Sequence, residues 1–158
     1  MLKTSSIITA VNEAVCTAFP DLTVYINTIA QDMERPSLYI DLLERTETDA
    51  GYNLVDVALS VNIVYFAALT ASGISDFTAV YDAQDTLIDL FRNGKLDVDD
   101  RSLTITVTGN GADIGEAYVR IDTRFLDDRD REPSHQPMIE DIQLRPKVQG
   151  NTTIHIKE

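Results

Sequence analysis

Residues that could support catalysis or bind a metal are few and widely separated in this sequence. His135 and His155 stand 20 positions apart, and neither has a second histidine or a cysteine at the spacing of a zinc site. Cys16 has no histidine near it in the sequence, and no Gly-x-Ser-x-Gly elbow is present. We therefore expect no metal, no cofactor and no enzymatic activity, although a fold can still bring distant residues together.

Two short stretches resemble ligand-binding loops. Residues 97–102 are rich in aspartate, but Arg101 occupies a position where a calcium loop needs a ligand, and Ser102 replaces the required glycine. The glycines at 109, 111 and 115 could suggest a phosphate loop, yet a strand pattern follows them and the loop has no Lys or Arg. We interpret the first stretch as a solvated turn and the second as a hairpin turn.

Charge and composition limit the class of protein further. The chain has 26 Asp and Glu against 13 Lys and Arg, a net charge of −13, which disfavours binding to a phosphate backbone. A single cysteine excludes a disulfide within the chain and favours a reducing compartment. We expect a soluble protein, since the sequence has neither a signal peptide pattern nor about 18 consecutive apolar residues.

Helical periodicity appears twice. Residues 5–18 repeat apolar side chains at helical spacing, with hydroxyl N-caps offered at residues 4–6, a stop at Pro20, and Cys16 on the polar side. Residues 76–91 form the second predicted helix, which ends at Asn93 and Gly94. Its predicted apolar face consists of Phe77, Val80, Tyr81, Gln84, Leu87, Ile88 and Phe91.

Strand patterns fill most of the remaining sequence. Alternation is strongest over residues 55–65, where one face is predicted to be buried, and it also occurs at 38–43, 103–107 and 117–125. A further β-rich stretch covers residues 22–29. This order predicts an α+β fold with a mainly antiparallel sheet packed with two principal helices.

The composition changes near residue 126. Residues 127–133 are a run of charges, and three of the five prolines follow at Pro133, Pro137 and Pro146. We predict one α+β domain over residues 1–126 and an extended C-terminal arm over residues 127–158. Residues 152–156 have the β-branched character to add as a strand to a sheet in their own subunit or another one.

Three arginines and three aspartates are candidates for assembly contacts. Arg35 could bind a carboxylate of an adjoining subunit or one of its own chain, and Arg120 and Arg124 project from the exposed face of the last strand. Three aspartates form a stripe along the second helix, because spacings of three and four bring side chains together. The stripe consists of Asp82, Asp85 and Asp89. It could be a solvated face, an electrostatic contact or a repulsive lining.

The order of these parts resembles the tail terminator family of bacteriophages and phage tail-like particles. The resemblance covers about residues 1–126. It depends on the first helix with the Phe19-Pro20-Asp21 end, Arg35-Pro36 leading into a strand, the long alternating strand, and the helix at 76–91. The long arm departs from the compact family pattern.

The resemblance implies a structural protein of the virion or tail-like particle that is assembled in the host cytoplasm. Such a subunit would form a homo-hexameric ring on the head-proximal end of the tail tube, stop its polymerisation and present a joining surface. Its partners would be the tail tube protein and possible sheath and connector proteins. It would not bind nucleic acid specifically, although DNA would pass through the channel of the ring, which the acidic stripe would line.

Three other functions remain open from the sequence. A head-to-tail connector or tail completion protein would share size and ring assembly with a terminator. An acidic mimic of nucleic acid that inhibits a basic host protein would also suit the net charge. The last is a small enzyme whose site is assembled between subunits.

Overall fold

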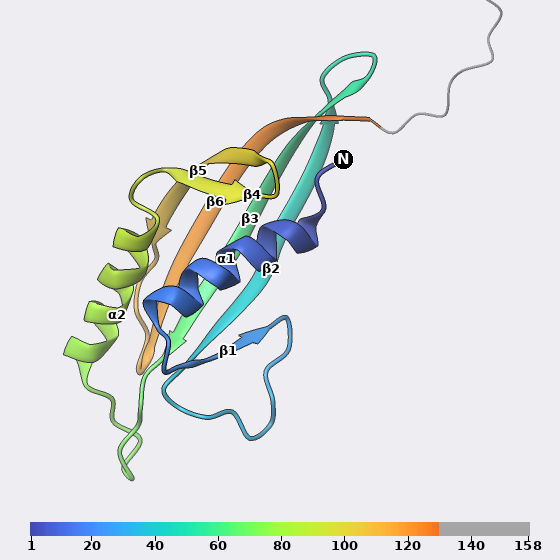
Figure 1. Cartoon of the computed structure of the whole chain (residues 1–158). Coiled ribbons are helices and arrows are strands. Elements are labelled where there is room, and N and C mark those ends of the chain that lie inside the picture. Colours follow the sequence, from blue (N-terminus) through green and yellow to red (C-terminus); the bar gives the residue numbers. More distant parts are fainter. Residues whose placement is uncertain (130–158) are drawn as a thin grey trace, which may run out of the picture.

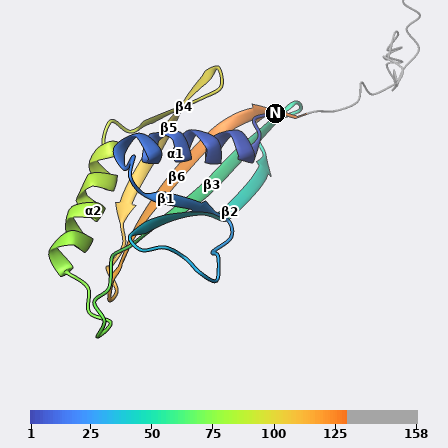
Figure 2. The same cartoon turned by 60° about the horizontal axis from the view of Figure 1, so that its bottom comes forward.

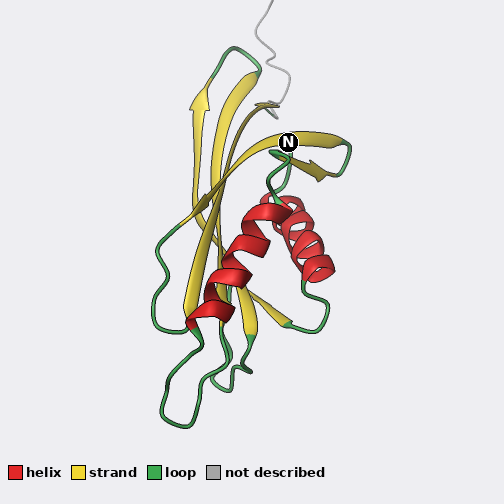
Figure 3. Ribbon diagram, turned by 90° about the vertical axis from the view of Figure 1, so that its left-hand side faces the viewer, coloured by secondary structure: helices red, strands yellow, loops and turns green. Residues whose placement is uncertain are grey.

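Two helices cover one face of a six-stranded sheet in the computed structural model, which describes residues 1–129 (Figure 1). Both helices lie on the same side of the sheet, and its opposite face carries no helix of the described part (Figure 3). The strands lie in the order β1-β2-β3-β6-β5-β4. The predicted α+β class with a mainly antiparallel sheet is confirmed.

Helix α1 (Thr4–Ala18) buries its apolar stripe against the sheet. Ile7, Ile8, Val11 and Val15 are buried, whereas Cys16 is exposed as predicted. The helix begins within the hydroxyl residues instead of after them, because Lys3 is the N-cap and no side chain caps the helix. It ends before Pro20, which cannot continue a helix.

Helix α2 (Phe77–Leu90) begins at a side-chain cap. Asp76 accepts a hydrogen bond from the Thr78 backbone N–H at 3.0 Å, which satisfies one of the free donors of the first turn. Val80, Gln84 and Leu87 are buried as predicted. The prediction for Phe77 and Tyr81 was wrong: both are largely exposed, because they lie on the flank of the helix, beside the buried stripe that Val80, Ala83 and Leu87 form.

The central strands pair along their whole length. β2 (Ser37–Asp49) and β3 (Leu54–Phe66) form the first predicted hairpin, with a bulge in β2 between Leu42 and Glu44. β3 also pairs antiparallel with β6 (Glu116–Asp128) over 13 residue pairs. The predicted alternation on β3 is confirmed, since Leu59, Val61 and Ile63 lie in the core.

The sheet edges differ from the sequence interpretation. β1 (Thr23–Ile26) is shorter than predicted and pairs parallel to β2. β4 (Lys95–Val98), which was not predicted, forms a hairpin with the start of β5 (Arg101–Gly109). The solvated turn expected over residues 97–102 is therefore reduced to Asp99 and Asp100, with strand on either side.

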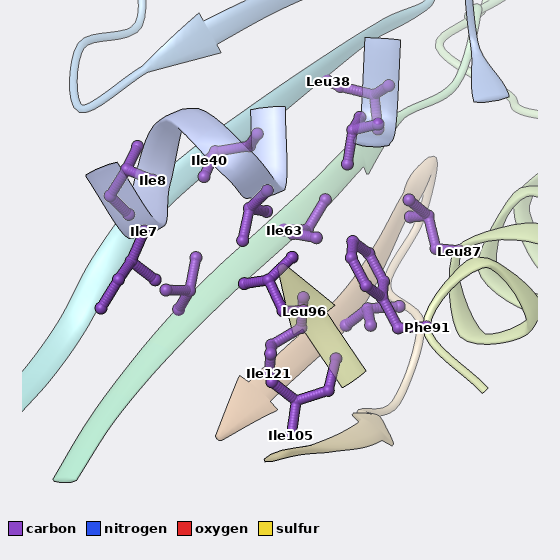
Figure 4. Packing of buried hydrophobic residues seen from close by; sticks show 14 of the residues in the cluster. Ile7, Ile8, Leu38, Ile40, Ile63, Leu87, Phe91, Leu96, Ile105 and Ile121 are labelled. Atoms are coloured by element: carbon purple, nitrogen blue, oxygen red, sulfur yellow. The ribbon is translucent and has the colours of Figure 1, made fainter. Parts of the chain in front are cut away.

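The core fills the space between the helices and the sheet (Figure 4). Side chains from α1, α2 and five strands belong to one buried cluster, so neither helix could be removed without exposing the sheet. Each fully buried aliphatic side chain contributes about 1.5–3 kcal/mol. The largest fully buried side chains are Ile7, Leu38, Ile40, Leu59, Ile63, Leu87 and Ile121.

Strand β6 ends at Asp128, two residues past the boundary that the sequence suggested. Asp127 is buried beneath the N-terminus, where its carboxylate accepts the Leu2 backbone N–H at 2.5 Å and pairs with Arg101 at 3.1 Å. The N-terminus therefore lies beside the end of β6 (Figure 2). The predicted arm from residue 130 onward, including the strand at 152–156, lies outside the described residues.

Candidate functional site

The uncovered face of the sheet carries a ladder of paired polar side chains on β3 and β6. The Arg120 guanidinium donates to Asp122 at 2.7 Å and to the Ser60 hydroxyl at 2.9 Å. Arg124 forms a bidentate pair with Asp56 across the two strands. These contacts bring Arg120 and Arg124 onto one surface, as the sequence predicted, but each has its carboxylate partner in its own chain.

The Arg124–Asp56 pair is an exposed one. The guanidinium, which donates to the Asp56 carboxylate, lowers the pKa of Asp56, and the carboxylate raises the pKa of Arg124. Water screens this pair because the Arg124 side chain is 74% exposed. The ladder therefore shapes the polarity of the surface more than it stabilises the fold.

Arg35 lies near the other end of the sheet and is also bound within the chain. Its guanidinium stands 5.2 Å from the centre of the Phe66 ring, donates to the Ala67 carbonyl at 3.3 Å and lies 3.8 Å from the Glu116 carboxylate. Of the two partners that the sequence left open for Arg35, the structure shows the one in its own chain.

Glu116 also binds the Tyr118 hydroxyl. The phenol donates to the Glu116 carboxylate, and this hydrogen bond, with burial and the nearby negative charges, raises the pKa of Tyr118 to about 12. The phenol thus stays protonated over the whole physiological range. The first residues of β6 are held against the end of β3 by the contacts of Arg35, Glu116 and Tyr118.

The acidic stripe of α2 is exposed to solvent. Asp82, Asp85 and Asp89 all point away from the core, as the spacing predicted. Asp89 pairs with Arg92 one turn further along the helix, whereas Asp82 and Asp85 have no ion-pair partner within residues 1–129. The structure thus places the stripe on a surface without assigning it a partner.

An apolar groove lies beside the start of α2 and was not predicted. It has a volume of about 520 Å³ and lies between α2 and the turn that leads into β6. Phe77 is 72% exposed and Ile114 79% exposed, and the adjoining Ile74 and Tyr81 are also largely in solvent. Large apolar side chains gathered at one place on a surface are typical of an interaction site. We name this surface, formed by Ile74, Phe77, Tyr81 and Ile114, the α2 groove.

Two features of the sequence could have indicated this groove. Ile74 and Ile114 each stand next to a glycine in a polar loop, where a large aliphatic residue has no core to join. Gly115 has a positive φ of 74°, and a Cβ at this position would meet a Leu69 methyl group at 3.0 Å. Glycine therefore allows the turn to lie close against the loop before α2.

Carboxylates outnumber cations among the described residues. All seven arginines of residues 1–129 form ion pairs within the chain, so the surplus of carboxylates has few cations left to bind. These residues contain 21 Asp and Glu against nine Lys and Arg.

In the same part of the chain, no three His, Cys, Asp or Glu residues come close enough to hold a metal ion. None of its helices is long and apolar enough to cross a membrane.

A paired polar ladder and an exposed apolar groove on a small α+β domain are features of a protein that binds other proteins. A family model described as phage tail terminator protein matches residues 6–135. The chain therefore belongs to the phage tail terminator family and is a structural component of a phage tail, which associates with other tail proteins. A search of curated proteins found no match.

Proposed function

We propose that this protein forms a ring on the head-proximal end of a phage or phage-like tail tube, stops tube polymerisation and provides the joining surface. The family match over residues 6–135 is the observation that carries this proposal. The proposed ring is a homo-hexamer, and its neighbours in the particle are the tail tube protein and, on the other side, a connector or sheath protein.

The fold supplies surfaces that suit such a ring. β1 and β4 are the two edges of the described sheet, and strand edges can pair with another chain. The α2 groove offers apolar area at one end of the domain. A subunit with two different contact surfaces can associate head to tail, and such contacts generate a closed ring when the rotation closes.

The polar residues have proposed roles in this ring. Arg35, Arg120 and Arg124 contribute to a subunit interface as already paired groups, so a neighbour would meet an ordered ladder instead of free cations. Asp82, Asp85 and Asp89 face the channel, where a negative wall would let DNA slide without adhering. Replacing these three aspartates by asparagine should then impair DNA passage while ring assembly survives, and unchanged infectivity would remove this role.

Two measurements on the purified chain test the proposal. Light scattering over a range of concentrations, with electron microscopy of any large species, should show a six-subunit ring. Tail tube protein that polymerises in the presence of the chain should give shorter tubes with the chain at one end only. Phe77→Ser removes exposed apolar area without touching the core. The same two measurements on this variant show whether ring formation and tube capping need the α2 groove.

The same assay separates a terminator from a head-to-tail connector. A connector would bind the finished end of a tail without changing the distribution of tube lengths. A chain that stays monomeric even when tube ends are added would contradict ring capping itself.

A further inference from the structure

We propose that the α2 groove binds residues 142–158 of a neighbouring copy of this chain. The α2 groove stays open in the described structure although its walls are apolar. Phe77 and Tyr81 are one helical turn apart, and Ile74 and Ile114 stand on the two flanking loops, so the four side chains surround one hollow. This inference rests on the proposed ring, because it needs adjacent copies.

Charge complementarity is the first argument for this occupant. Asp113 lines the groove, and Asp76 caps α2 beside it. Both are exposed, and neither has an ion-pair partner within residues 1–129. A ligand that fits must therefore combine apolar side chains with positive charge.

Residues 142–158 are the part of the chain with that combination. They contain three basic residues and one acidic residue, whereas the other 141 residues contain ten basic and 25 acidic. The seven arginines of residues 1–129 each pair with a carboxylate of their own chain, so binding to another copy would first break that pair. The basic residues of the segment are Arg145, Lys147 and Lys157, and its large aliphatic residues are Ile142, Leu144, Val148, Ile154 and Ile156.

The length of the connection indicates that the segment comes from a neighbouring copy. The groove adjoins the start of β6, and the described chain ends just after the opposite end of that strand (Figure 1). Strand β6 spans roughly 40 Å, and the 12 residues 130–141 reach at most about 43 Å when fully extended. Seating the whole segment, from residue 142 onward, in its own groove would need an almost straight path past the molecule, so an adjacent copy is the better source.

A photo-cross-linker in the full-length chain tests this contact directly. Benzoylphenylalanine replaces Phe77, an exposed aromatic position that tolerates an aromatic analogue, and the cross-linked peptides are identified by mass spectrometry. Mixing isotopically heavy and light chains shows whether the two peptides come from different copies. The matched control carries the same group in place of Leu126, which is exposed at the other end of β6.

The expected result is a mixed heavy and light product that joins position 77 to a peptide within residues 142–158, without this product from position 126. Reversing two charges with Arg145→Glu and Lys147→Glu should lower its yield about tenfold, whereas Arg131→Glu, outside the segment, should not. Cross-links to another part of the chain, to the same copy alone or to added tail tube protein would overturn the inference, as would unchanged yield after charge reversal.

Light scattering and the tube-length assay on the same samples separate this inference from the proposed function. Rings that limit tube length but cross-link elsewhere refute the arm contact and leave capping intact. The expected cross-link in a sample that does not limit tube length supports the contact and refutes capping.

Discussion

Asp127 is the side chain whose removal should cost this fold the most for a single polar group. Its carboxylate lies under the N-terminus and accepts the backbone N–H groups of Leu2 at 2.5 Å and Asp128 at 3.0 Å. Arg101 adds a third contact at 3.1 Å. The side chain is 1% exposed, so water cannot replace these partners without opening the structure. The replacement Asp127→Ala therefore removes the link between the N-terminus, β5 and the end of β6.

The size of the effect follows from these contacts. Removing one partner of a buried ion pair costs about 3–5 kcal/mol, and leaving a buried donor unpaired costs about 1–3 kcal/mol. Arg101 is 38% exposed and can turn toward water, which favours the lower end of the range. We expect about 3 kcal/mol, which for a domain of this size lowers the Tm by about 6–12 °C.

Thermal unfolding followed by circular dichroism measures this shift, with Asp128→Ala as the matched control. Asp128 is the next residue, is exposed and forms no side-chain hydrogen bond or ion pair within residues 1–129, so its loss should change stability by less than about 0.5 kcal/mol. Equal Tm values for the two variants, or a loss below about 1 kcal/mol for Asp127→Ala, would refute the argument that a buried carboxylate holds the N-terminus.

Three further outcomes are expected. Burial alone would raise the pKa of Asp127, but the hydrogen bonds from Leu2 and Asp128, with Arg101 and the N-terminal charge, lower it. The contribution of Asp127 to the free energy of unfolding is therefore complete above the ordinary pKa of about 3.9 and is lost as the pH falls through the folded value. Urea midpoints should then fall less between pH 6 and pH 3 in Asp127→Asn than in the original chain. Gln84→Met keeps the volume but removes the amide that donates to two backbone carbonyls at 2.5 and 2.9 Å, which should cost about 1–3 kcal/mol in urea unfolding. Glu116→Gln should lower the pKa of Tyr118 from about 12 toward its ordinary value of 10, which ultraviolet titration of the phenolate can follow; an unchanged titration curve would contradict the hydrogen bond.

The elements with strong periodicity could be predicted from the sequence. The alternation over 55–65 gave the central strand because a face that alternates with period two can be buried against helices. The first helix and the two hairpins followed from the same reasoning. These segments carry most of the core, and the core depends on which residues are apolar more than on their exact partners.

The edges of the sheet could not be predicted because they carry little periodic signal. β1 and β4 have four residues each, too few to show a period, and β1 pairs parallel with β2, which only the tertiary fold can determine. The residues around Asp99 look like a loop because three aspartates disfavour a strand. There, Leu96 and Val98 lie in the core and outweigh this preference.

The partners of the candidate arginines were also beyond the sequence. Arg35 and Glu116 are far apart in the chain, as are Arg124 and Asp56, and the pairing of β3 with β6 brings the latter two together. A spacing pattern shows which face of a strand carries a charge, but it does not show what lies on the next strand. This is why the sequence left open whether Arg35 binds its own chain or a neighbour.

The most informative failure concerns Phe77 and Tyr81. Their spacing with Val80, Gln84 and Leu87 is that of a helix face, yet they lie on the flank of its buried stripe and are left in solvent. Local pattern and fold usually agree in a natural protein, and the places where they disagree are often functional. The chain is strongly acidic, so copies of it repel one another, and the arginines of residues 1–129 are already paired. Association must then rely on apolar area and on positive charge brought from elsewhere. The α2 groove supplies the apolar area, and residues 142–158 supply the charge, which is why both are assigned to the same contact.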